Sequence, residues 1–403
     1  MKKKNSILAT VIATLVILVI AAFVFIQPYL NSTTYASEDN IAAFLGAAFG
    51  KYPRFVNEKD FDKVELIEIS QSDGHNYISI ALDGFIEKRD AYLEAYQAAS
   101  EAGSEAPEMP DFSDLLKTYQ TDSKVSGFTE LSNFKNLVEV NIAANLFPVS
   151  SNLEEFKDAV NLKSLIISGN GENETKITDI SVLSDKTALT DLALDDNAIS
   201  DISALSALAN LETVSLNNNE ITDISALRGK NKITSLSLAT NKISDISALA
   251  GMSELTSLYL DENEIVDISP INGNESITTI SLSKNSISDI APVATLKSAS
   301  VISLSSNSIT DVSPLTAFAD VTSNVYILLT ENTGITDWSV LDTLPENIMI
   351  YGKPEATEDE SAETTDNDVA NTETTDNEEN AETVPSEPTD DEAENVGDDG
   401  AQE

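Results

Sequence analysis

The stretch NNNEITDISALRG, residues 217–229, places three asparagines before hydrophobic residues whose spacing fits neither an amphipathic helix nor an alternating strand. The same signature recurs along the chain. It begins at Asn197, Asn219, Asn241, Asn263, Asn285 and Asn307, and neighbouring copies are 22 residues apart in every case. A fixed period of this length indicates a repeat architecture in which each copy is one supersecondary unit stacked on the next.

One period, residues 211–227, reads L-x-x-V-x-L-x-x-N-x-I-x-x-I-x-x-L, which is the leucine-rich-repeat template. Its first half alternates with period two, as a half-buried strand does. Its second half has an apolar residue at every third position, as a 3₁₀-like turn does. We therefore predict an α/β solenoid. It is a horseshoe of 22-residue coils with parallel strands on the concave face, 3₁₀-like turns on the convex face and a helical N-terminal cap.

The repeated asparagine has a physical explanation within this fold. After each strand the chain turns inward and directs backbone N–H and C=O groups into the dry interior, where an unpaired group costs about 1–3 kcal/mol. An amide side chain both donates and accepts hydrogen bonds, so stacked asparagines can satisfy these groups. We predict a structural asparagine ladder formed by Asn170, Asn197, Asn219, Asn241, Asn263, Asn285, Asn307 and Asn332.

Composition argues against several classes of function. The formal net charge of −45 disfavours nucleic acid and anionic membrane surfaces as partners. The chain has no cysteine and a single histidine, His75, and no Gly-rich phosphate loop precedes a helix. We expect no catalytic site, no bound metal and no cofactor.

The N-terminus resembles a membrane-targeting segment. Lys2, Lys3 and Lys4 precede an almost unbroken apolar run over residues 7–26, which is long enough to cross a bilayer core of roughly 30 Å as a helix. Positive charge before the run predicts that the following chain lies outside the cell. Two outcomes stay open: an uncleaved single-pass anchor, or a secreted product cleaved after Ala36.

We divide the chain into four segments. Residues 1–36 are the signal or anchor, residues 37–130 are an N-terminal cap with an insert, residues 131–353 are the leucine-rich repeats, and residues 354–403 are an acidic disordered tail. Within the cap, residues 41–49 are expected to form a helix and residues 64–69 a first strand. The insert, residues 73–130, is either an extended cap or a module specific for a partner.

The repeats resemble those of bacterial internalins. Residues 189–318 match the pattern L-x-x-L-x-L-x-x-N-x-I-x-D-I-x-x-L almost letter for letter. The resemblance implies a surface-displayed array that binds a protein ligand on its concave strand face. The chain shows no sortase-type sorting motif, which shifts the expected anchoring to the N-terminus, and no evident immunoglobulin-like domain follows the repeats.

Outward positions of the predicted strands are mostly small and polar. Tyrosines are enriched at binding hot spots, so Tyr259 and Tyr326 are the best candidate anchors. Acidic side chains near Tyr259 predict a patch that binds a basic or polyhydroxy partner, with Ca²⁺ as an alternative ligand. The candidate binding residues are Asp191, Asp195, Asp196, Asn217, Tyr259, Asp261, Glu262 and Tyr326.

The leading hypothesis is a membrane-anchored, extracytoplasmic protein that mediates protein–protein interaction or adhesion at the bacterial cell surface. Its partner is expected to be a protein or a cell-envelope polymer. The alternatives are a structural spacer of the envelope without one specific ligand, and an envelope enzyme with its catalytic residues in the insert.

Overall fold

The computed structural model describes residues 34–35, 62–72, 75–121, 134–143, 150–168 and 176–354. The chain divides into two units at Pro354, and every described residue belongs to the first. The apolar run at residues 7–26, the predicted cap helix at residues 41–49, Asn170 and the acidic tail lie outside the described residues. Predictions about these segments therefore stay predictions.

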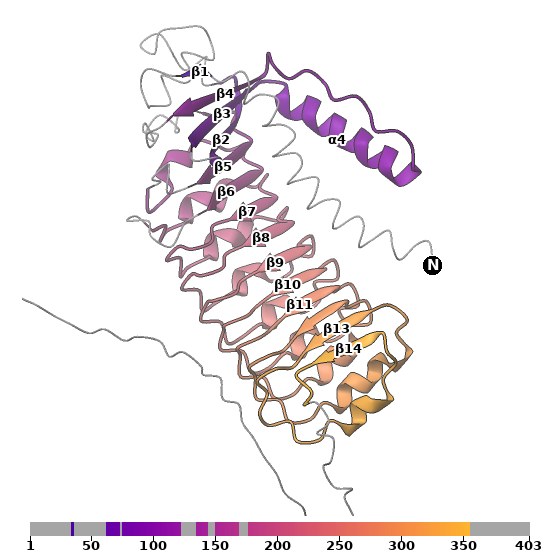
Figure 1. Cartoon of the computed structure of the whole chain (residues 1–403). Helices are drawn as coiled ribbons and strands as arrows, with labels where there is room; N and C mark the ends of the chain where they lie inside the picture. The colour runs from indigo at the N-terminus through magenta and orange to yellow at the C-terminus, as the bar shows by residue number, and fades with distance from the viewer. Residues whose placement is uncertain are drawn as a thin grey trace, which may run out of the picture. The chain divides into compact units, whose positions relative to one another are not determined.

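The described strands form one sheet, in which β2 to β14 lie in a continuous stack (Figure 1). The strand order is β1-β4-β3-β2-β5 and then sequential to β14, and every pair from β2·β5 to β13·β14 is parallel. This arrangement confirms the predicted solenoid. The strands are β1 Thr34–Tyr35, β2 Val64–Ser72, β3 His75–Leu82, β4 Leu116–Thr121, β5 Glu139–Ala143, β6 Ser164–Ser168, β7 Asp191–Ala193, β8 Thr213–Ser215, β9 Ser235–Ser237, β10 Ser257–Tyr259, β11 Thr279–Ser281, β12 Val301–Ser303, β13 Val325–Leu328 and β14 Ile348–Tyr351.

A short 3₁₀ helix returns the chain between successive strands of the array. Each of those from η4 onward follows a D-x-[S/A] step, as in Asp223 and Ser225, where the carboxylate accepts a hydrogen bond from the Ser225 N–H at 2.7 Å. The same hydrogen bond lowers the pKa of the equivalent Asp201 and Asp245 carboxyls. These helices are η3 Glu154–Phe156, η4 Ser181–Asp185, η5 Ser203–Ala207, η6 Ser225–Leu227, η7 Ser247–Leu249, η8 Ser269–Ile271, η9 Ala291–Thr295, η10 Ser313–Asp320 and η11 Ser339–Thr343.

The core is a column of identical layers. In one coil Leu211, Leu216, Ile221, Ile224 and Leu227 are all buried, and each packs against its equivalents in the neighbouring coils within a single cluster. Burying such a side chain contributes about 1.5–3 kcal/mol. No coil could bury this face alone, so the stacking of coils stabilises the fold.

The asparagines supply the polar part of each layer. The Asn219 amide nitrogen donates to the carbonyls of Leu194 and Leu216, and its oxygen accepts the Ile199 N–H at 3.0 Å. The side chain thus pairs backbone groups of its own coil and of the preceding coil. The same arrangement is present at Asn197, Asn241, Asn263, Asn285, Asn307 and Asn332.

Part of the insert extends the same sheet. β3 pairs antiparallel with β2, and β4 pairs antiparallel with β3. Alternate residues such as Ile78 and Ile80 join the solenoid core. The N-terminal end of the described array is therefore covered by a meander of longer strands that continues its sheet.

The remainder of the described insert forms an arm built on α4, Phe85–Ala102. The helix lies between Gly84 and Gly103, both in the left-handed region, and it projects from the sheet together with the segment that follows it (Figure 1). Its base packs Phe85 edge-on against Phe112 at 5.3 Å between ring centroids, over Ala81 of β3. This second, small core attaches the arm to the opposite face of the sheet from the solenoid core.

Candidate binding surface

The side chains that alternate with the buried ones on β5 to β14, together with the outward residues that follow each strand, form what we call the strand face. Register fixes its columns: Ala193, Ser215, Ser237 and Tyr259 are directly paired across β7 to β10. Adjacent strands lie about 4.8 Å apart, so neighbours in one column are within contact distance.

A second ladder runs along the strand face, in the column just beyond the strands. The Asp195 carboxylate accepts hydrogen bonds from the N–H of Asn217 at 2.6 Å and from the Ser215 hydroxyl at 2.8 Å. The Asn217 side-chain oxygen accepts the N–H of Ala239 at 2.7 Å, and Asp261 accepts the N–H of Ser283 at 2.9 Å. In this column a side-chain oxygen of one coil therefore pairs a backbone N–H of the next coil.

The other predicted acidic residues also have partners within the chain. Asp191 accepts a hydrogen bond from the Thr190 hydroxyl at 2.7 Å, and Asp196 accepts one from the Asn218 amide at 2.6 Å. Glu262 forms an ion pair of 2.7 Å with Lys284. These contacts leave fewer free carboxylate lone pairs for a ligand than the sequence implies.

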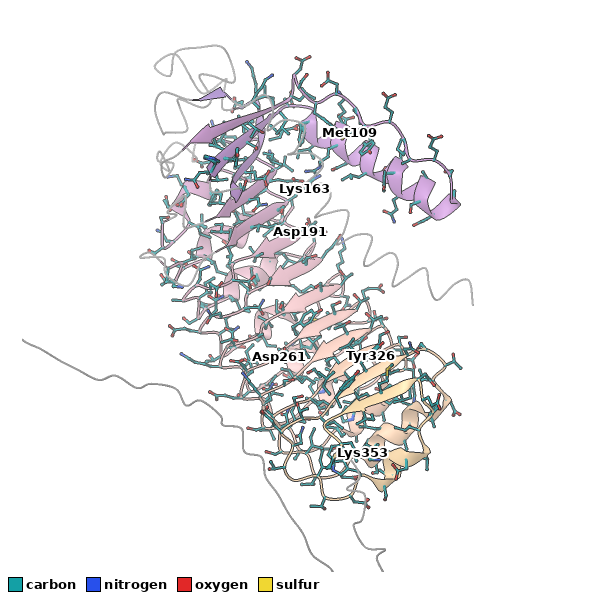
Figure 2. The ribbon with its side chains drawn as sticks, viewed as in Figure 1. Met109, Lys163, Asp191, Asp261, Tyr326 and Lys353 are labelled. Atoms are coloured by element: carbon teal, nitrogen blue, oxygen red, sulfur yellow. The ribbon has the colours of Figure 1, made fainter. Side chains whose placement is uncertain are left out.

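The predicted acidic patch is also divided in space. Asp195 and Asp261 lie three coils apart, with Asn217 and Ala239 between them in the column, and Figure 2 shows Asp191 and Asp261 at separate levels of the stack. Tyr259 is half-buried, with Ser237 and Ser281 as its paired neighbours. The binding role of these residues stays a prediction, but they do not form one continuous acidic surface.

The last three strands carry a different surface, of which the sequence predicted only Tyr326 as a binding residue. Val301, Tyr326 and Met349 are directly paired across β12 to β14, and Leu328 pairs with Tyr351. Tyr326 is 38% exposed and Tyr351 is 49% exposed, the largest exposures of aromatic side chains among the described residues. We call these five residues the C-terminal patch. In the sequence, this surface could have been found from the large side chains at alternate positions of residues 325–328 and 348–351.

The opposite end of the strand face lies under the base of the arm. Arg89 of α4 forms two hydrogen bonds of 2.6 Å with the Glu139 carboxylate of β5. Beside them, burial and then the neighbouring Glu139 carboxylate raise the pKa of Glu68 to about 7. This ion pair fixes the base of α4 to the beginning of the parallel array.

Comparison with known proteins shows which repeats these resemble. A model of leucine-rich repeats in two copies matches residues 209–251. The crystal structure of an internalin, InlF, from Listeria monocytogenes matches with a TM-score of 0.51 at 27% identity, over 58% of this chain and 66% of that chain. The chain carries internalin-type leucine-rich repeats.

Two further internalins of Listeria monocytogenes are among the solved structures that match. InlC2 matches at 23% identity with a TM-score of 0.36, over 65% of this chain and 90% of that one. The functional domain of InlJ matches at 20% identity with a TM-score of 0.37, over 62% and 59%. A search of curated proteins by sequence finds no match.

Across the described residues no three His, Asp or Glu side chains are grouped to hold a metal ion. Among the helices that the structure describes, none has the length and apolar character needed to cross a bilayer. The apolar run at residues 7–26 was not among them, so its role as an anchor stays a prediction.

Proposed function

We propose that this chain is a protein-binding solenoid of the cell envelope, held by residues 7–26 and exposed outside the cell, and that the C-terminal patch is its contact surface. The observation that carries the proposal is the paired arrangement of Tyr326 and Tyr351 with Leu328 and Met349 on neighbouring strands. Aromatic side chains surrounded by apolar ones are enriched where binding energy concentrates.

The C-terminal patch is favoured over the acidic residues for a physical reason. Asp195 and Asp261 already accept backbone N–H groups of the next coil, so a ligand would have to compete with bonds that hold the array together. Tyr326 and Tyr351 present apolar ring area to solvent, and covering that area stabilises a complex. The acidic residues then serve to steer a basic partner, an effect on association rate more than on affinity.

Affinity capture with the full-length chain tests the binding proposal. We expect one saturable partner, and Tyr326→Ala to weaken its binding at least tenfold. The matched control is Val266→Ala, because Val266 is also apolar and is 57% exposed outside the C-terminal patch. Diffuse retention that disappears with salt and is equal for both variants would instead favour the envelope spacer.

Fractionation tests the anchoring proposal separately. We expect the full-length chain to sediment with membranes and a chain lacking residues 1–36 to be released. N-terminal sequencing of the mature protein distinguishes the two open outcomes, since cleavage after Ala36 leaves Ser37 as the first residue. A chain lacking residues 1–36 that still sediments with membranes would contradict anchoring by this segment.

A further inference from the structure

The sheet ends at β14 in the described part of the chain, and β14 pairs there only with β13. The last strand of a sheet presents a row of backbone N–H and C=O groups on its outer side, which is a template for another strand. The strand is short, and all four of its side chains are apolar or aromatic: Ile348, Met349, Ile350 and Tyr351.

The backbone direction of β14 follows from its bonds to β13. The carbonyl of Asn347 accepts the Val325 N–H at 2.9 Å, and the carbonyl of Tyr351 accepts the Leu329 N–H at 2.8 Å. Alternate residues of a strand direct their backbone groups to the same side. Asn347 and Tyr351 therefore face β13, and the N–H and C=O of Ile350 face away from it.

Apolar side chains flank this edge on both sides of the sheet. On the strand face, Met349 and the half-exposed Tyr351 continue the C-terminal patch to the edge. On the core side, Trp338, Leu344 and Ile350 pack against the solenoid core but stay partly exposed. The end of a solenoid ordinarily needs a polar cover, whereas this end offers apolar surface beside free backbone groups.

The sequence restricts what can cover this edge. Residues 355–403 contain no Leu, Ile, Met, Phe, Tyr or Trp and only three isolated valines, so the chain's own tail offers no strand with apolar side chains at alternate positions. A second copy is disfavoured by charge, because each tail carries 20 Asp and Glu residues without a Lys or Arg. Pairing two β14 edges would bring two such tails together.

We propose that β14 accepts an extended, basic segment of a protein partner as an additional strand. The inference rests on the proposed binding function and specifies how the partner is held. Main-chain hydrogen bonds to Ile350 would supply affinity, and alternate side chains of the segment would cover Tyr351 on one face and Trp338 on the other. Positive charge on the segment would complement the exposed Glu346 and the acidic residues that follow β14 in the sequence, whereas Asp342 is already paired with Lys353.

The first test uses a defined probe and the full-length chain. A fluorescein-labelled octapeptide of alternating Val and Lys should bind saturably in fluorescence anisotropy, and the peptide of alternating Val and Glu should not. Ile350→Pro removes the outward N–H while a proline is tolerated at an edge position of this kind. We expect it to weaken binding of the Val-Lys peptide at least tenfold, whereas Ile350→Val, which keeps the N–H, binds as the parent does.

A second measurement leaves the protein unchanged, so that misfolding of the proline variant cannot decide the result. A Val-Lys peptide methylated on every backbone nitrogen loses the strand-pairing donors of both its edges but keeps its charge and side chains. We expect its binding to be at least tenfold weaker than that of the unmethylated peptide.

Four results would each overturn the inference. Equal binding of the methylated and unmethylated peptides, or binding by Ile350→Pro equal to that by Ile350→Val, would show that charge on the tail holds the peptide. Concentration-dependent dimers in sedimentation that Ile350→Pro abolishes would assign the edge to a second copy. If Tyr326→Ala weakens capture of the natural partner but Ile350→Pro does not, the proposed function survives without strand addition.

Discussion

Replacing Asn241 by leucine tests the physical account of the repeat. The Asn241 amide nitrogen donates to the carbonyls of Leu216 at 2.9 Å and Leu238 at 3.1 Å, and its oxygen accepts the Ile221 N–H at 3.0 Å. Asn241 is 9% exposed and lies in the middle of the array. Leucine has a similar volume and no polar atom, so the substitution removes these bonds with little change in packing.

The expected loss follows from the number of backbone groups left without a partner. The carbonyls of Leu216 and Leu238 keep the amides of Asn219 and Asn263 as donors, and the Ala239 carbonyl keeps the Asn218 N–H. The Ile221 N–H loses its acceptor. One buried donor left unpaired costs about 1–3 kcal/mol, so the expected decrease in the free energy of unfolding is about 2 kcal/mol.

Urea denaturation followed by circular dichroism measures this decrease, and hydrogen exchange locates it. The Ile221 amide should lose protection more than amides in distant coils, because its acceptor is removed. Asn231→Leu is the matched control, since Asn231 is exposed in the same repeat and should change the midpoint little. An unchanged midpoint with unchanged protection of the Ile221 amide would refute the reasoning.

Three further changes probe other parts of the chain. Gly352→Ala should destabilise β14 by more than about 1 kcal/mol, because φ is +104° and the new Cβ would lie 2.6 Å from the Thr330 nitrogen; Gly251→Ala, with φ of +81° and open space, should cost less in the same urea titration. Glu68 binds its proton more tightly folded than unfolded, so stability should fall as pH rises from 4.5 to about 7. Glu68→Gln should remove up to about 3 kcal/mol of that loss, whereas Glu87→Gln on the exposed helix surface should not. Deleting residues 355–403 should leave the melting temperature unchanged, and a lower value would show that the tail docks.

The repeat itself could be predicted because the same pattern of residues recurs in each coil. The 22-residue spacing and the positions of Leu216, Ile221 and Ile224 determine which residues are buried, and the structure agrees with them. Local chemistry sufficed at the turns as well, because Asp223 pairs with a backbone N–H only two residues away.

The binding surface could not be predicted in the same way because it depends on register between strands. Tyr326 follows Val301 by 25 residues and Met349 follows Tyr326 by 23, so the 22-residue period does not align them. The hydrogen bond from the Asn217 N–H to Asp195 also joins different coils, so it cannot be seen in the sequence of one coil. The sequence showed only that these two side chains face outward, and that favoured a ligand-binding role for them. The direction of β3 was likewise undetermined, because the alternation of Ile78 and Ile80 fits a strand of either orientation.

The two polar ladders have a consequence for how such an array can change in length. The ladder bonds that link coils in the regular region join groups at a constant offset in the adjoining coil, as Asn219 does with Ile199 and Asn241 does with Ile221. Duplicating one complete unit in the regular region, for example residues 209–230, therefore recreates every donor and acceptor at the new junctions. The array would grow by one strand spacing, about 4.8 Å, with no compensating substitution. The 25-residue step from Asn307 to Asn332 keeps the asparagine ladder intact, so an insertion of another length is accommodated only where it falls between the ladder positions.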